Sequence, residues 1–384
     1  MSNYPALAEP VALGALQLPH RVIMSSLTRN RSLPTTVPND DNVKYYAQRA
    51  NPETGASLIL SEGTLISHQG TEWPYAPGIW DETHAAGWKK VTDAVHAQGG
   101  QIVAQIWHTG RVCHPDMPEQ SVGGEPVWAP SAIGARGGKF RLLPGRPGYI
   151  SNPTPIPDPT VILDQFTNAA KMAKLADFDG VELHSGNGYL CEQFLSDVSN
   201  ARTDKWGGSV ENRARFGLEA TKRLIDVWGA DRVGIKISPL GGYNDTYNTT
   251  PESRIETFKY YVSALDDLSL AYIQIMASTF GDPCHGGVPQ GFDHDIFEHY
   301  GPLIKKSNLI ANAEFDAAKG EEAVKSGKAK AIVFGRPFVA NPDFYSRAQN
   351  GIALAEPDVR SFYLHRVQGV NGSGYNDYPV ATLS

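Results

Sequence analysis

The chain has 384 residues, of which 41% are hydrophobic and 20% charged, and a formal net charge of −7. This composition supplies enough apolar side chains for a sizeable core and excludes a disordered or low-complexity protein. The acidic balance argues against a nucleic-acid partner, because proteins that bind nucleic acids usually carry a basic surplus.

The three cysteines, Cys113, Cys191 and Cys284, lie far apart in the sequence. Their spacing argues against a disulfide framework, a zinc site and an iron–sulfur cluster. No apolar run approaches the ~20 residues of a membrane-spanning helix, and the first residues lack the pattern of a signal peptide. We therefore expect a cytoplasmic protein with no metal site and no membrane partner.

Eight short β-rich segments follow one another along the chain, and stretches with helical spacing separate most of them. The expected strands cover residues 22–27, 57–61, 102–106, 181–184, 233–238, 272–277, 309–313 and 331–335. The clearest helical patterns contain Trp88, Phe166, Phe216 and Phe258. Alternating strands and helices are typical of a parallel sheet. Eight such units favour an α/β protein whose residues 1–384 form a single (β/α)8 TIM barrel.

Three segments lie outside this repeat. Residues 1–20 precede the first strand, and their pattern around Gly14 predicts a hairpin that closes the barrel floor. Residues 109–159 are rich in glycine and proline, and a long insertion of this kind, here after the third strand, is usually functional. The tail from Pro357 carries four aromatic residues, which predicts that it docks on the barrel.

Several strands direct a polar side chain toward the barrel axis near their carboxyl ends, namely Gln105, His184, Lys236 and Gln274. Barrel interiors are usually apolar, and barrel active sites lie at this end. An unpaired buried polar group costs about 1–3 kcal/mol, so the set predicts a bound ligand. The alternative is a structural network in which Glu182 pairs with Lys236 and the glutamines bond to the backbone.

Gly335 and Arg336 directly follow the eighth expected strand. Free backbone N–H groups and a guanidinium at this place suit a phosphate. The alternative is that Arg336 caps a helix or pairs with Asp343. No G-x-G-x-x-G sequence joins a strand to a helix, which makes a dinucleotide bound in the Rossmann manner unlikely.

Long motifs occupy the middle of the chain: HSGNGYL at 184–190, QFL at 193–195, SN at 199–200, RTD at 202–204, GGS at 207–209 and ENRARF at 211–216. Further motifs lie at 27–29, 45–50, 62–64, 76–80, 105–108, 334–338 and 341–343. Together they resemble the old yellow enzyme family of FMN-dependent ene-reductases over essentially the whole chain. The resemblance implies an oxidoreductase that uses NADPH or NADH to reduce the activated C=C bond of α,β-unsaturated carbonyl or nitro compounds. In such an enzyme hydride passes from flavin N5.

The resemblance also assigns roles to single residues. His184 and Asn187 would bind the substrate oxygen, and Tyr189 would be the proton donor. Thr28 would bond flavin O4, Gln105 would hold the pyrimidine edge, and Gly335 with Arg336 would hold the phosphate. The remaining assignments are Gly63, Lys236, Ala313 and Glu314 to the flavin site, and Tyr243 and Tyr375 to the substrate pocket.

Four positions depart from the family's usual pattern. Lys236 stands where the family has Arg, which keeps the charge but loses the bidentate fork. Ala313 and Glu314 replace a usual Gly-Asn pair; a carboxylate would repel the phosphate, so we expect Glu314 to turn outward. Ser26 replaces a usual Pro. Thr28 is not a departure, since Thr at this position is what the resemblance gives for the fungal and plant branch, whereas the thermophile-like branch has Cys.

Other functions are compatible with parts of the sequence. The iron–sulfur dienoyl-CoA reductases share the barrel but need clustered cysteines. An inward Lys236 could form a Schiff base in a lyase of the TIM-barrel aldolase type. A non-catalytic flavin-binding protein is the remaining alternative. The partner we expect is a small-molecule enone or nitroalkene, and the assembly a monomer or homodimer.

Overall fold

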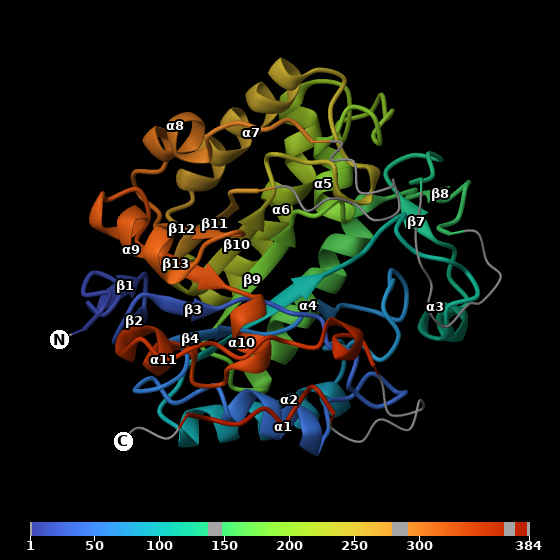
Figure 1. Ribbon diagram of the computed structural model, residues 1–384. Helices are drawn as coiled ribbons and strands as arrows, with labels where there is room; N and C mark the ends of the chain where they lie inside the picture. The colour runs from blue at the N-terminus through green and yellow to red at the C-terminus, as the bar shows by residue number, and fades with distance from the viewer. Residues whose placement is uncertain (1, 137–147, 279–290, 365–372, 382–384) are drawn as a thin grey trace.

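Eight parallel strands close into a ring in this computed structural model, which describes residues 2–136, 148–278, 291–364 and 373–381 (Figure 1). Each strand pairs with the next in sequence, and pairing of the last with the first completes the barrel. The strands are β3 (Val22–Met24), β4 (Leu58–Leu60), β6 (Ile102–Trp107), β9 (Gly180–Ser185), β10 (Val233–Ile237), β11 (Tyr272–Met276), β12 (Leu309–Asn312) and β13 (Ala331–Phe334). The expected (β/α)8 barrel and its eight strands are confirmed.

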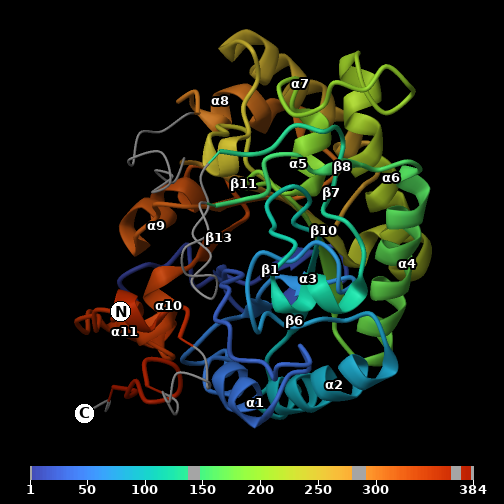
Figure 2. The same cartoon turned by 90° about the vertical axis from the view of Figure 1, so that its right-hand side faces the viewer.

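Helices cover the outside of this ring (Figures 1 and 2). They are α1 (Asp40–Ala47), α2 (Glu82–Ala97), α4 (Pro159–Leu175), α6 (Val210–Trp228), α7 (Pro251–Asp266), α8 (Ile296–Tyr300), α9 (Ala317–Lys325), α10 (Arg336–Ala340) and α11 (Phe344–Asn350). At the start of each of the four longest helices, the side chain of the N-cap residue accepts a hydrogen bond from a backbone N–H of the first turn. These N-cap residues are Asp81, Asp158, Ser209 and Thr250. Such caps satisfy donors that the first helical turn leaves unpaired.

Alternation along the strands divides the core into two layers. Residues such as Val181, Leu183 and Ile235 face the helices in the larger layer. The smaller layer lies on the barrel axis, where residues of several strands meet Leu16 and Leu18. These two leucines belong to β2 (Leu16–Leu18), which pairs antiparallel with β1 (Val11–Leu13). The predicted N-terminal hairpin is therefore confirmed, and it packs against the apolar floor of the barrel.

Gly14 makes the turn of this hairpin possible. Its backbone has φ +59°, and an added Cβ would lie 2.2 Å from the carbonyl oxygen of Asp231. A left-handed conformation and so close a backbone contact together require glycine.

The insertion after β6 contains short elements rather than continuous loop. They are α3 (Pro118–Gly123) and the paired strands β7 (Trp128–Ala129) and β8 (Thr154–Pro155). The strand β5 (Thr64–Leu65) extends the pairing of β6 before the insertion begins. Figure 1 shows α3, β7 and β8 together on one side of the molecule. The short helix α5 (Leu190–Leu195) follows β9.

The described part of the tail docks on the barrel, as its aromatic residues predicted. Tyr375 is fully buried and stacks on Tyr45, with ring centroids 4.2 Å apart. Arg29 donates from Nη2 to the carbonyl of Gly374 at 2.7 Å, and Arg31 donates to that of Ser361 at 2.9 Å.

Across the residues that the structure describes, no helix is both long and apolar enough to cross a membrane. The same residues contain no group of three or more His, Cys, Asp or Glu side chains that could hold a metal ion. Cys113 and Cys191 are buried free thiols, and Cys284 lies outside the described residues.

Candidate active site

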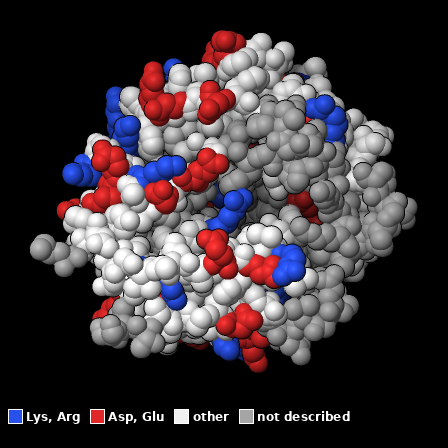
Figure 3. Space-filling model, viewed as in Figure 1, with Lys and Arg blue, Asp and Glu red and all other residues white. Residues whose placement is uncertain are grey.

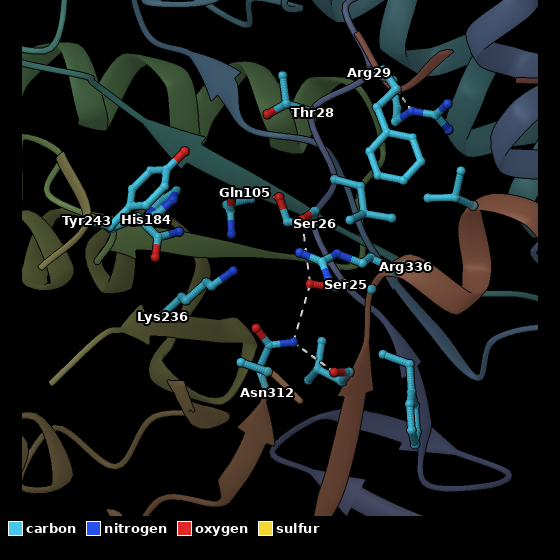
Figure 4. Close-up of a pocket in the computed structure, with 18 of the residues that line it drawn as sticks. Ser25, Ser26, Thr28, Arg29, Gln105, His184, Lys236, Tyr243, Asn312 and Arg336 are labelled. Carbon is cyan, nitrogen blue, oxygen red and sulfur yellow. Dashed lines mark hydrogen bonds between the residues drawn. The ribbon is translucent and has the colours of Figure 1, made fainter. Parts of the chain in front are cut away.

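A cavity of about 620 Å³ opens at the carboxyl ends of the barrel strands (Figure 4). Its walls come from the carboxyl ends of β6, β9, β10, β12 and β13 and from segments that follow the strands, so residues distant in sequence converge there. The lining residues are Ser25–Arg29, Trp73, Gln105, Trp107, His184, Asn187, Tyr189, Lys236, Tyr243, Asn312–Phe315, Val333–Pro337, Val339, Phe362 and Tyr363. Figure 3 shows acidic and basic side chains interspersed on this face, with basic groups at the edge of a central hollow.

His184 presents a neutral donor to the cavity. The backbone N–H of Gly186 donates to Nδ1 of His184 at 3.3 Å, so in the neutral imidazole the proton sits on Nε2. Burial, and then the nearby charge of Lys236, lower the pKa of His184 well below its ordinary value of 6.5. His184 therefore acts near pH 7 as an N–H donor without a full positive charge.

Asn187 is held by its backbone. It has φ +56°, a left-handed conformation that Asn tolerates better than most residues. Its N–H donates to Ser238 Oγ at 2.7 Å, and its carbonyl accepts from Asn244 Nδ2 at 2.9 Å. With both backbone groups engaged, the carboxamide of Asn187 lines the cavity beside His184.

A buried ion pair supports the loop that carries Asn187 and Tyr189. Arg254 pairs with Glu192, and both side chains are almost completely buried. The other carboxylate oxygen of Glu192 accepts from Gly188 N at 2.8 Å and from Ser238 Oγ at 2.7 Å. The positions of Asn187 and Tyr189 thus depend on a network that continues to α7.

Tyr189 lies at the wall of the same cavity, 4% exposed. Its ring makes edge-on contacts with His184 and Trp107, with centroids 5.1 and 4.8 Å apart. Burial is the main reason that the pKa of the Tyr189 phenol lies well above 10. The phenol is therefore protonated at neutral pH, as a proton donor must be.

Lys236 also lines the cavity, and it neighbours His184 in the sheet register. No ion pair connects it to Glu182 within the described part of the chain. Instead, both glutamines donate to the Glu182 carboxylate, Gln105 at 2.6 Å and Gln274 at 2.7 Å. Gln105 and Gln274, two of the predicted inward polar residues, thus find a hydrogen-bond partner within the protein. Lys236 and His184 instead face the open space (Figure 4).

Gln105 is oriented at both ends of its amide. Its Nε2 donates to Glu182, and its Oε1 accepts from Ser26 Oγ at 2.6 Å. Ser26 therefore supplies a hydrogen bond that the usual proline could not. One N–H and one lone pair of the Gln105 amide remain for a ligand, and Thr28 lines the same wall.

Arg336 begins α10 and lines the cavity wall. The alternative pairing with Asp343 is wrong, because Asp343 accepts from Arg347 Nε at 2.8 Å and from the backbone N–H of Ala381. Within the described residues Arg336 has no ion pair, so its guanidinium is available to an anionic ligand.

Ala313 and Glu314 both adopt left-handed backbone conformations, with φ +72° and +59°. This geometry explains in physical terms why Gly-Asn would suit the position better. The side chain of Glu314 is exposed at the rim of the cavity, in agreement with the outward orientation expected from charge repulsion.

Two predicted site residues lie elsewhere. Tyr375 is absent from the cavity wall and instead packs between Tyr45 and the arginines that anchor the tail. Gly63 does not line the cavity either; an added Cβ there would lie 2.7 Å from the Trp107 ring. Gly63 therefore acts indirectly by giving Trp107 room, whereas Tyr243 lies on the wall as expected.

Several aromatic residues of the wall had not been predicted. Trp73 and Tyr363 stack with ring centroids 4.5 Å apart, which brings the tail against the loop after β5. The aromatic residues of the tail predict that it docks, but nothing in the local sequence around Trp73 indicates that Trp73 contacts the tail.

Comparison with known proteins gives consistent matches over nearly the whole chain. The family model described as "NADH:flavin oxidoreductase / NADH oxidase family" matches residues 6–355. A "Probable flavin mononucleotide-dependent alkene reductase" from Leishmania infantum is 36% identical, with 97% of each chain covered. "12-oxophytodienoate reductase 7" from Oryza sativa subsp. japonica is 34% identical, covering 97% of this chain and 94% of the relative. The solved structure of an old yellow enzyme homologue from Zymomonas mobilis has a TM-score of 0.86 and 34% identity, and the match covers 98% of this chain and 99% of that chain.

Proposed function

Because this chain belongs to the old yellow enzyme family of NADH:flavin oxidoreductases, we propose that it reduces activated C=C bonds with NADPH or NADH as the reductant. The substrates would be α,β-unsaturated carbonyl or nitro compounds. The observation that carries the proposal is the convergence of His184, Asn187 and Tyr189 on one cavity.

The residues present fit FMN. The cavity is within the size range of cofactor and ligand pockets. Lys236 in β10 and Arg336 at the start of α10 offer two cationic groups from different elements, which suits a ligand with an anionic phosphate and a ring system that gains negative charge on reduction. We assign Thr28 and Gln105 to the ring edge, Lys236 to its pyrimidine end, and Gly335 with Arg336 to the phosphate.

FMN, when bound, supplies the two-electron redox chemistry between nicotinamide and alkene. The protein's own side chains act on the alkene substrate, by binding its oxygen and by protonating its carbon. His184 Nε2–H and the Asn187 amide donate to the substrate's carbonyl or nitro oxygen, where negative charge develops in the transition state. Preplaced donors of this kind are typically worth about 3–4 kcal/mol each. Tyr189 then gives its phenolic proton to the carbon that becomes carbanion-like.

The Schiff-base alternative for Lys236 is not favoured, since the family members matched are reductases. Burial lowers the pKa of Lys236 below its ordinary 10.5, with Glu182 acting against the shift, so a direct test is informative. Purified protein should consume NADPH in proportion to cyclohexanone formed from 2-cyclohexen-1-one. Absence of that product, together with borohydride trapping of a carbonyl substrate on Lys236, would support the lyase instead.

Replacing Glu314 with Asn is expected to tighten FMN binding about two- to tenfold. The change removes a carboxylate from the rim near the phosphate site, and Asn also tolerates the left-handed backbone better. Titration of deflavinated protein with FMN, followed by flavin fluorescence, measures the effect, which should shrink at high salt. Glu322→Gln on α9, an exposed carboxylate outside the cavity wall, is the matched control. Equal changes in both variants would contradict a local effect.

A further inference from the structure

Glu72 lies outside the cavity lining but connects directly to the proposed proton donor. Tyr189 Oη donates to Glu72 Oε2 at 2.9 Å, and Tyr149 Oη donates to Glu72 Oε1 at 2.6 Å. One carboxylate therefore bridges two phenols, one from the loop after β9 and one from the insertion. Neither Glu72 nor Tyr149 is among the predicted site residues.

The bridge also extends to Asn187, one of the two residues proposed to bind the substrate oxygen. Tyr149 Oη lies 2.9 Å from Asn244 Oδ1, and Asn244 Nδ2 donates to the backbone carbonyl of Asn187 at 2.9 Å. Tyr149 is 9% exposed. The hydroxyl end of Tyr189 and the backbone of Asn187 thus both contact one connected group of side chains, formed by Glu72, Tyr149 and Asn244.

Ring packing alone fixes only part of the Tyr189 geometry. Trp107 and His184 contact its ring edge-on, whereas the hydroxyl is fixed by Glu72 and by Trp73 Nε1, which donates to it from 3.4 Å. A proton donor must sit within about 3 Å of the atom that it protonates, and a displacement of ~1 Å can cost up to about 100-fold in rate.

We propose that Glu72 is a positioning residue for proton transfer: through its bridge to Tyr149 it holds the Tyr189 hydroxyl at the place from which the substrate carbon is protonated. This inference rests on the proposed function. Burial and the Glu72 charge both raise the pKa of Tyr149 and of Tyr189, which keeps the two phenols protonated and able to hold the bridge.

The test compares the two half-reactions by anaerobic stopped-flow spectroscopy on the holoenzyme. Glu72→Ala should slow flavin reoxidation by cyclohexenone about tenfold or more, the size of one or two charge-assisted hydrogen bonds, and leave flavin reduction by NADPH unchanged. Glu72→Gln keeps an acceptor oxygen and should retain more of the rate. Tyr149→Phe, which removes the far anchor, should give a smaller loss. The control is Glu119→Gln, a buried carboxylate, which accepts from the backbone N–H of Tyr75 instead.

A double-mutant cycle separates positioning from general damage. In a Tyr189→Phe background, Glu72→Gln should cause no further slowing of flavin reoxidation. The shifts that the two substitutions cause in the midpoint of urea unfolding should likewise be non-additive. Equal slowing of both half-reactions, or full additivity of both measurements, would overturn the proposal for Glu72 while leaving the proposed function intact. A Tyr189→Phe enzyme with undiminished reoxidation would instead refute the donor role itself.

Discussion

Tyr189→Phe is expected to slow alkene reduction about 10²–10³-fold, because general acid catalysis by a positioned side chain typically contributes a factor of this size. The hydroxyl is the only group that the substitution removes, and the ring contacts with Trp107 and His184 can persist. Reduction of the flavin by NADPH needs no proton from the phenol, so its rate should remain nearly unchanged.

Single-turnover kinetics without oxygen distinguish these steps. The prereduced variant is mixed with cyclohexenone to follow reoxidation, and the oxidised variant is mixed with NADPH to follow reduction. Equal losses in the two half-reactions would show that Tyr189 supports the site's structure and is not the proton donor.

The double variant His184→Ala, Asn187→Ala should lose about 10²–10⁴-fold in the alkene half-reaction. In the proposed mechanism both donors stabilise the charge that develops on the substrate oxygen, and removing one such donor typically costs a factor of about 10²–10³. The effects of the two single variants should not simply add, since the residues bind the same atom.

Binding of a phenolic ligand, such as 4-hydroxybenzaldehyde, measures the same donors without turnover. The double variant should bind it at least tenfold more weakly in a spectrophotometric titration. An unchanged dissociation constant would contradict the assignment of His184 and Asn187 to the anionic oxygen. The FMN content of the variant serves as the control for an intact cavity.

The barrel could be predicted from the sequence because its strands are short apolar runs with regular spacing. Strand alternation also placed His184 and Lys236 inward, and the register confirms that they are neighbours. The strand after residue 21 ends at Met24 rather than at residue 27, because the following residues leave the sheet to line the cavity.

Contacts across long sequence separations could not be predicted. The resemblance assigns Tyr375 to the substrate pocket, but its stacking on Tyr45 depends on how the tail docks. The bridge from Tyr149 through Glu72 to Tyr189 joins three segments whose local sequences carry no common pattern. In the alternative structural network, Glu182 pairs with Lys236 and the glutamines bond to the backbone. In the structure both glutamines donate to Glu182 instead, which depends on the exact barrel geometry.

The visible spectrum of the purified protein, recorded under nitrogen before and after addition of NADPH, tests the central claim most directly. We predict a yellow protein with a bound flavin absorbance that NADPH bleaches and cyclohexenone restores. A colourless protein that neither takes up FMN nor oxidises NADPH would contradict the account.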